Sequence, residues 1–341
     1  MPLLGRSTSQ HLASCGLDDL DDCIIRTPCE PDTTFSDDPL RMMRAVRFAS
    51  QLGFDIDDDT FDGICRQAER INIITKERIS VELSKIMASP VPSIGLTLMR
   101  TSGLLKYVLP ELDRMGGVER RGKHAHKDNF EHTMKVLDNL AKRTDDIWLR
   151  WAALFHDIGK PQTKAYDPHH GWTFHQHEAV GSKMIPQLFR RLKLPMNEPM
   201  RFVQKMVFLH MRPIVLSEDL VTDSAVRRLL FEAGDDIEKL MMLCEADITS
   251  GIDSKVQRYL RNFELVRSKM KDLEERDRVR NFQPPITGEI IMKTYNISPC
   301  AVIGEIKEVI KNAILDGVIP NDYDAAYALM EQEAERRGLH K

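Results

Sequence analysis

The sequence lacks any run of roughly 20 apolar residues, the length that a membrane-spanning helix needs. Its N-terminus also lacks the basic and then apolar layout of a secretory signal peptide, so we expect a cytoplasmic protein without a membrane partner. The six cysteines lie at positions 15, 23, 29, 65, 244 and 300. No two of them have the spacing of a zinc knuckle or a redox motif, and reduced thiols are therefore expected.

The sequence also lacks an excess of positive charge, because 48 Lys and Arg residues stand against 52 Asp and Glu residues. Any contact with nucleic acid must therefore come from local basic patches. Segments with the alternating Val, Ile and Thr pattern of strands are nearly absent. Apolar residues instead recur at helical spacing from about residue 37 onward, so we predict an all-α chain of two or three domains.

Breaks in the helical pattern divide the chain. Asp38 and Pro39 suit the N-cap and first position of a helix that ends at Gly53. Pro110 and the glycines at 116–117 mark one boundary, and the charged run 271–278 leads into another. The predicted segments are 1–36, a leader of weak order with one possible strand at 23–28; 37–115, a helical domain; 116–280, a second helical domain; and 281–341, a small helical tail.

Histidine is concentrated in one part of the chain, because nine of the eleven histidines lie between His124 and His210. His156 and Asp157 follow the apolar run 151–155, which must be buried. Burying a carboxylate beside an imidazole is costly unless something compensates, and a divalent cation does so directly. The alternative is a hydrogen-bonded His-Asp pair in the core with no metal.

Three separated elements, His132, then His156–Asp157, then Asp247, resemble the pattern of the HD phosphohydrolase superfamily. The resemblance implies a divalent metal, which could be Mg, Mn, Fe, Co, Ni or Zn. In HD proteins with two metals, two further histidines occupy roughly the places of His177 and His210. The predicted metal ligands are His132, His156, Asp157, His177, His210 and Asp247.

Such a site activates water for in-line attack on a phosphoester without a covalent intermediate. Asp157 and Lys160 are the predicted catalytic residues, with Lys160 stabilising the charge on the phosphate. Lys160 could instead cap the end of its helix. Arg212 is a candidate phosphate contact.

Residues 36–48 resemble the neck helix of class II tRNA nucleotidyltransferases and bacterial poly(A) polymerases, in which an acidic pair is followed by Arg three residues after the second acid. The resemblance implies that Asp38 and Arg41 contact the base edges of CTP and ATP. Arg41, Arg44 and Arg47 recur every three residues and would form a basic stripe for nucleotide or tRNA phosphates. The alternative is that Asp38 is only an N-cap and the arginines are a solvated surface.

The resemblance covers about residues 16–340, with 37–115 as the neck and 116–280 as the HD domain. It departs from the family at the front, where the Gly-rich turn before an Asp-x-Asp pair and the later Arg-Arg-x-Asp motif are missing. Asp55-Ile56-Asp57 and the acidic residues at 18–22 are interpreted as solvated surface. We therefore expect a short remnant of an α/β head domain, a truncated chain, and no nucleotidyl transfer by this chain alone.

Three functions follow. The first is a metal-dependent HD phosphohydrolase, acting on a 2′,3′-cyclic phosphate or a phosphomonoester, attached to elements that bind tRNA or other RNA 3′ ends. The second is a family nucleotidyltransferase that is silent unless a head domain is supplied. The third is a helical tRNA-binding module whose metal is structural and supports no turnover.

Overall fold

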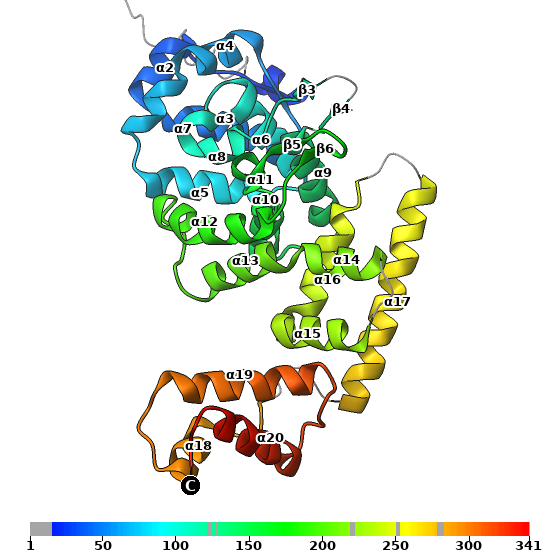
Figure 1. Cartoon of the computed structure of the whole chain (residues 1–341). Coiled ribbons are helices and arrows are strands. Elements are labelled where there is room, and N and C mark those ends of the chain that lie inside the picture. The colour runs from blue at the N-terminus through cyan, green and yellow to red at the C-terminus, as the bar shows by residue number, and fades with distance from the viewer. Residues whose placement is uncertain are drawn as a thin grey trace, which may run out of the picture. The chain divides into compact units, whose positions relative to one another are not determined.

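The computed structural model describes residues 16–121, 124–126, 128–218, 222–249, 253–277 and 283–340. These residues are mostly helical, with three short two-stranded sheets among them (Figure 1). The all-α prediction is confirmed. None of the described helices combines the length and the apolar character that crossing a membrane requires. All the cysteines of the described ranges, which leave out Cys15, are free thiols.

The chain forms two compact units. The first contains Met1–His210 together with Ala246–Thr249, and the second contains Met211–Glu245 together with Ser250–Lys341. This division differs from the predicted segments, whose boundaries were placed at 36/37, 115/116 and 280/281. The predicted neck and the first part of the predicted HD segment share one compact unit.

The helices and strands of the first unit follow the order of the chain. They are β1 (Ile24–Ile25), α2 (Pro31–Asp37), α3 (Leu40–Leu52), β2 (Asp55–Ile56), α4 (Asp58–Gln67), the 3-10 helix η1 (Ala68–Ile73), α5 (Lys76–Met87), α6 (Pro92–Thr101), α7 (Leu105–Val108), α8 (Pro110–Asp113), β3 (Arg120–Arg121), β4 (His124–Ala125), α9 (Asn129–Ala141), α10 (Ile147–Phe155), α11 (Lys160–Thr163), β5 (Ala165–Asp167), β6 (Gly171–Thr173), α12 (His177–Arg191) and α13 (Glu198–Leu209).

The expectation of weak order is wrong for residues 16–36, while residues 1–15 lie outside the described ranges. Residues 16–21 are helical, and β1 pairs in parallel with β2, so that Ile24 lies opposite Asp55. Helix α2 buries Phe35 against α4. Asp57, the last residue of the Asp-x-Asp sequence, caps α4 and forms a 2.6 Å ion pair with Arg26, so its role here is structural.

Helix α10 is apolar apart from Arg150, and all of its residues from Leu149 to Phe155 are buried. It packs against α5, α9 and α13, which makes it the central helix of the first unit. Helix α6 of the predicted neck packs on α9, where Ser93 Oγ donates a 2.6 Å hydrogen bond to Asp138. Glu111 and Arg191 add a bidentate ion pair. These contacts cross the predicted boundary at 115/116, which explains why no separate neck unit forms.

The second unit contains the remaining helices. They are α14 (Met211–Glu218), α15 (Asp223–Ala233), the 3-10 helix η2 (Gly234–Asp236), most of α16 (Ile237–Asp247), α17 (Asp253–Asp277), α18 (Gly288–Tyr295), α19 (Ala301–Leu315) and α20 (Tyr323–Arg336). Helix α17 packs against α14 and α15, whereas α18 and α20 pack against α19 around Ile306, Ile310 and Met330 (Figure 1). The last two residues of α16, Ala246 and Asp247, belong to the first unit.

Candidate metal centre

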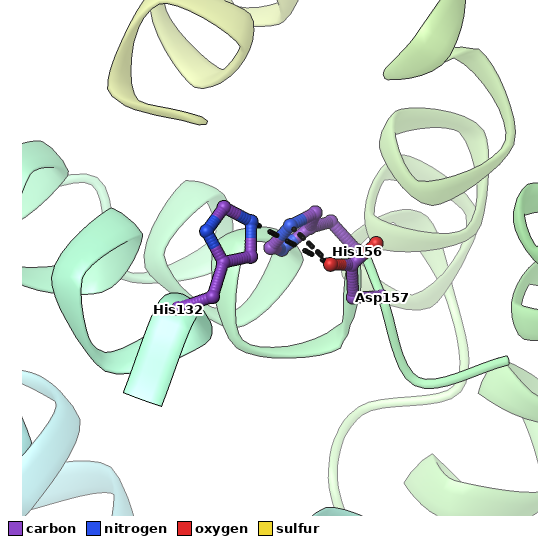
Figure 2. Close-up of side chains that lie close together, drawn as sticks. All are labelled: His132, His156 and Asp157. Carbon is purple, nitrogen blue, oxygen red and sulfur yellow. Dashed lines mark ion pairs between the residues drawn. The ribbon is translucent and has the colours of Figure 1, made fainter. Parts of the chain in front are cut away.

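The predicted metal ligands come together in the first unit, although they come from five separate helices or helix ends. His132 lies in α9, and His156 directly follows α10, with Asp157 next to it (Figure 2). His177 is the first residue of α12, His210 directly follows α13, and Asp247 is the last residue of α16. Helix ends can present side chains to a common point because the chain changes direction there.

The ligands form two groups that share Asp157. Asp157 Oδ2 lies 3.6 Å from His132 Nε2 and 3.3 Å from His156 Nε2, and Asp247 Oδ1 lies 2.8 Å from His132 Nε2. Asp157 Oδ1 faces the other way, 3.2 Å from His177 Nε2 and 3.9 Å from His210 Nε2. Each oxygen of one carboxylate therefore serves a different pair of imidazoles.

The outer nitrogens of the four imidazoles are all held by hydrogen-bond partners. His156, His177 and His210 each place Nδ1 at 2.7–2.9 Å from the carbonyl oxygen three residues earlier, which belongs to Ala153, Phe174 and Val207 respectively. A carbonyl can only accept, so Nδ1 carries the proton and the lone pair of Nε2 in a neutral ring points to the centre. His132 Nδ1 instead contacts the Thr249 hydroxyl at 2.9 Å, which can donate or accept.

Burial and charge set the protonation of this centre. Burial lowers the pKa of His210 to about 3, so its ring is neutral. Burial would also lower the pKa of His156, but the carboxylates of Asp157 and Asp247 raise it to about 9. Burial would raise the pKa of Asp157, yet His156 and Lys160 hold it well below its usual range. The centre thus holds a buried carboxylate that attracts positive charge.

The donor set fits a divalent cation. His156 Nε2 is buried and has no hydrogen-bond partner among the described residues, although it points at two carboxylates. An orphaned imidazole nitrogen in a dry site needs a compensating group, and neutral nitrogen combined with anionic oxygen is the ligand type that Zn, Mn, Fe, Co and Ni accept. In the alternative, a His-Asp core pair without metal, this nitrogen faces Asp157 Oδ2 at 3.3 Å as an ion pair that lacks hydrogen-bond geometry.

Gly159 brings the two ligand groups together, a role that the sequence did not reveal. Its φ of −80° is one that any residue adopts, so backbone conformation does not require glycine here. A Cβ at this position would lie 2.2 Å from the carbonyl oxygen of His177 and 2.7 Å from the backbone nitrogen of Gly181. Only glycine therefore lets the turn after Asp157 approach α12 closely enough to place Asp157 beside His177.

The two predicted phosphate contacts lie in different surroundings. Lys160 is the first residue of α11, and its Nζ lies 2.5 Å from Asp157 Oδ2. Its charge therefore balances the buried carboxylate. Arg212 belongs to the second unit, where it forms a 2.9 Å ion pair with Glu232.

The predicted nucleotide-binding residues of the neck do not form one stripe. Asp38 Oδ1 accepts a 3.2 Å hydrogen bond from the Leu40 backbone N–H, but the N-cap residue of α3 is Pro39 and not Asp38 as predicted. Arg41 and Arg44 are exposed, whereas Arg47 forms a 2.8 Å ion pair with Glu82. Three residues turn a helix by 300°, so Arg47 points about 120° away from Arg41, toward α5.

Sequence reasoning missed the residues that orient the ligands. Thr249 and Gly181 carry no motif of their own, and the three carbonyl acceptors are backbone atoms. One signal was present for the carbonyls, because each lies three residues before a candidate histidine near a helix end. His126 and His170 lie outside the centre, in loops or short hairpins. The side chain of His124 lies outside the described part of the chain.

Two known protein families match parts of this chain. The family described as the probable RNA and SrmB-binding site of polymerase A matches residues 53–115, and the HD domain family matches residues 129–251. The matched ranges fall inside the predicted neck and HD segments. Fold and site together define a helical protein in which an HD domain follows a polymerase-type RNA-binding segment.

Three curated relatives identify the family. The A-adding tRNA nucleotidyltransferase of Deinococcus radiodurans is 31% identical over 309 residues, which make up 87% of this chain and 69% of that protein. The CC-adding tRNA nucleotidyltransferase of Thermus thermophilus is 30% identical over 310 residues, 86% of this chain and 66% of that one. The multifunctional CCA protein of Methylococcus capsulatus is 32% identical over 226 residues, 63% and 52% of the two chains. The chain belongs to the tRNA nucleotidyltransferase family, and it spans between 52% and 69% of the length of these relatives.

Solved structures agree on the fold. The CCA-adding enzyme of Bacillus stearothermophilus, determined in complex with CTP, superposes with a TM-score of 0.58 at 23% identity. The match covers 95% of this chain and 69% of that one.

Proposed function

We propose that the centre formed by the six ligands binds divalent metal ions and hydrolyses phosphoesters, such as a 2′,3′-cyclic phosphate or a phosphomonoester at an RNA 3′ end. The observation that carries this proposal is the position of Asp157, whose two oxygens face two different pairs of imidazoles. His132, His156 and Asp247 would hold one cation and His177 and His210 the other, with Asp157 between them. When bound, such cations supply the Lewis acidity that activates water for attack on phosphorus.

The protein's own groups prepare the site for this reaction. The carbonyls of Ala153, Phe174 and Val207 fix the imidazole tautomers before any ligand arrives, which removes a reorganisation cost. The apolar residues of α10 exclude bulk water from one side. Lys160 balances Asp157 in the metal-free protein. With cations bound beside Asp157, the ammonium group of Lys160 would be available to neutralise a phosphate.

We further propose that the neck binds the RNA or nucleotide, through Asp38, Arg41 and Arg44. Two of the relatives named above are tRNA nucleotidyltransferases by name, and Arg41 and Arg44 are exposed. Arg47 would contribute less, because it is already ion-paired with Glu82. CTP and ATP are the nucleotides expected from the family resemblance.

The test is hydrolysis of 2′,3′-cyclic AMP and p-nitrophenyl phosphate with Mn, Ni, Co, Mg and Zn, using the wild type and the double variant His156→Ala/Asp157→Ala. Metal-dependent turnover that disappears in the double variant supports the proposal. Bound metal without turnover on any substrate overturns it, and leaves a structural metal in an RNA-binding protein.

A second candidate function is nucleotidyl transfer to tRNA. It is supported by the 31% identity with an A-adding enzyme over 87% of the chain. Incorporation of labelled CTP and ATP into a tRNA that lacks its terminal CCA tests it. Incorporation that survives the same double variant would assign this activity to residues outside the metal centre, and no incorporation would reject it for this chain.

A further inference from the structure

Two short hairpins lie beside each other in the first unit (Figure 1). Strands β3 and β4 form the first hairpin, with Arg121 opposite His124, and β5 and β6 form the second, with Tyr166 opposite Trp172. Strand β4 contacts β6. The function proposed above uses neither hairpin, although together they gather aromatic and cationic side chains at one place.

The rings of this surface each lie against a cation. Tyr166 and Trp172 meet edge to face, with centroids 5.2 Å apart and planes at 73°. Arg121 Cζ lies 4.5 Å from the Tyr166 centroid, and Lys164 Nζ lies 4.6 Å from the Trp172 centroid. Both rings are partly exposed and Arg121 is exposed. These are the two kinds of surface on which nucleobases stack, aromatic rings and guanidinium planes.

The same set of rings continues toward the metal centre. His126 contacts Trp172 at 5.5 Å and Phe174 at 6.0 Å, both edge to face. Lys160 Nζ lies 5.7 Å from the Phe174 centroid and 2.5 Å from Asp157 Oδ2. The carbonyl of Phe174 also holds the ring of His177. A series of neighbouring side chains therefore connects the two hairpins to Asp157, the carboxylate that the two ligand groups share.

The charge of this surface suits a phosphate-bearing ligand. Arg121 has no carboxylate partner in the part of the chain that the structure describes. Lys164 forms a 2.6 Å ion pair with Glu119, but the Glu119 side chain is 65% exposed, so solvent weakens this pair. Asp167, the other acid of the second hairpin, accepts hydrogen bonds from the backbone N–H groups of His169 and His170, which satisfy it locally.

A purely structural role, in which these side chains only stabilise the hairpins, explains fewer of the observed contacts. A cross-strand aromatic pair such as Tyr166 and Trp172 accounts for the edge-to-face contact. It does not account for an exposed guanidinium over one ring and an ammonium over the other, or for the continuation through Phe174 to Lys160.

We propose that Arg121, His126, Lys164, Tyr166, Trp172 and Phe174, here named the hairpin platform, bind the base and sugar-phosphate of the nucleotide whose phosphoester enters the metal centre. The inference deepens the proposed hydrolase function and rests on it. The substrate class is then a ribonucleotide end, with the base read by stacking, and not an arbitrary phosphomonoester.

The first experiment measures binding without turnover. Equilibrium dialysis of AMP, ribose 5-phosphate and inorganic phosphate uses the full chain in an Arg41→Ala background, which removes the contact proposed for the neck. We expect Arg121→Ala and Trp172→Ala each to weaken AMP binding by roughly 10- to 100-fold and to leave inorganic phosphate unchanged. Trp172→Phe keeps a ring and should retain most of the affinity.

The controls separate stacking from misfolding. Trp148→Phe changes a tryptophan that packs on Phe189, away from the hairpins, and should not affect AMP binding. Arg121 is on the surface, so its substitution does not threaten the fold. Equal affinity for AMP and ribose 5-phosphate, or AMP affinity that neither variant changes, would contradict the proposal that the hairpin platform binds the base.

Turnover distinguishes this inference from the function on which it rests. If AMP binding depends on Trp172 but no metal gives hydrolysis, the platform stands and the hydrolase proposal fails. If 2′,3′-cyclic AMP and glycerol phosphate are hydrolysed equally and the variants change neither, the hydrolase stands and the platform fails. A short oligoribonucleotide with a 3′-phosphate, compared with the free nucleotide, shows which of the two is the preferred source of the base.

Discussion

His177 Nε2 lies 3.3 Å from His210 Nε2, while each ring directs its Nδ1 to a backbone carbonyl. With the protons on the outer nitrogens, two acceptor lone pairs face each other, which is unfavourable unless a positive charge lies between them. A proton on His210 does not resolve this contact near neutral pH, because burial lowers the pKa of that ring to about 3. A proton on His177 Nε2, which also faces Asp157 Oδ1 at 3.2 Å, resolves it, and so does a metal cation bound between the two rings.

Substitution of single histidines should separate the two ligand groups. We expect the wild type to bind roughly two equivalents of Mn or Co, and His177→Ala and His132→Ala each to lose roughly one, because they lie on opposite oxygens of Asp157. Asp157→Asn should lose both. Metal analysis after dialysis measures this, with His170→Ala as the control. Full loss in either single variant would contradict two separable sites.

The Thr249 hydroxyl should tune metal affinity through His132. Its contact with Nδ1 at 2.9 Å orients the ring, and removal of such an outer partner lowers metal affinity by roughly 10- to 100-fold. Thr249→Val should show this loss in a competition titration with a chelator. Thr249→Ser keeps the hydroxyl and should bind metal like the wild type. Equal metal affinity of the Val and Ser variants would show that the Thr249 hydroxyl does not support the His132 ligand.

A methyl group at Gly159 should separate Asp157 from His177. Because the added Cβ would meet backbone atoms at 2.2 and 2.7 Å, we expect Gly159→Ala to destabilise the protein by about 1–3 kcal/mol and to reduce metal binding. Gly304→Ala is the matched control, since nothing lies within 4 Å of its Cβ and helix α19 should gain roughly 0.5–1 kcal/mol. Urea unfolding and metal content measure both effects. Wild-type metal content in Gly159→Ala would refute the packing role.

Arg150 should hold the predicted neck to the HD bundle. It is 2% exposed, and its guanidinium donates to the carbonyls of Met87, Ser89, Ala141 and Thr144. Lysine cannot reproduce this fork, so Arg150→Lys should cost about 3 kcal/mol or more in the free energy of unfolding. The exposed Arg66→Lys should change stability little. An unfolding midpoint of Arg150→Lys equal to that of the wild type would reject the prediction.

The Glu111–Arg191 pair should make stability depend on pH in the acid range. Burial would raise the pKa of Glu111, but its hydrogen bonds to Arg191 lower it below the ordinary value. A lowered folded pKa means that the charged form stabilises the protein above the unfolded pKa of about 4.3, and that this contribution is lost as the pH falls through the folded pKa. The stability difference between the wild type and Glu111→Gln should therefore be larger at neutral pH than near pH 3. The exposed Glu77→Gln should show no such trend in urea unfolding, and a constant difference for Glu111→Gln would contradict the argument.

The sequence by itself determined the helical class, the end of α3 at Gly53, and which His and Asp side chains meet at the centre. The first two depend on local periodicity and on end signals close in sequence. The cost of burying a carboxylate in an apolar helix indicated His156 and Asp157, and the resemblance to HD proteins implied the other ligands. The tertiary structure alone decided that Asp157 is shared between two groups, that Gly159 must approach α12, and that Arg47 pairs with Glu82. It also decided that the neck and the first part of the HD segment form one compact unit. Each of these depends on contacts between residues far apart in the chain, whose relative positions are set by packing around α10 and not by any local pattern.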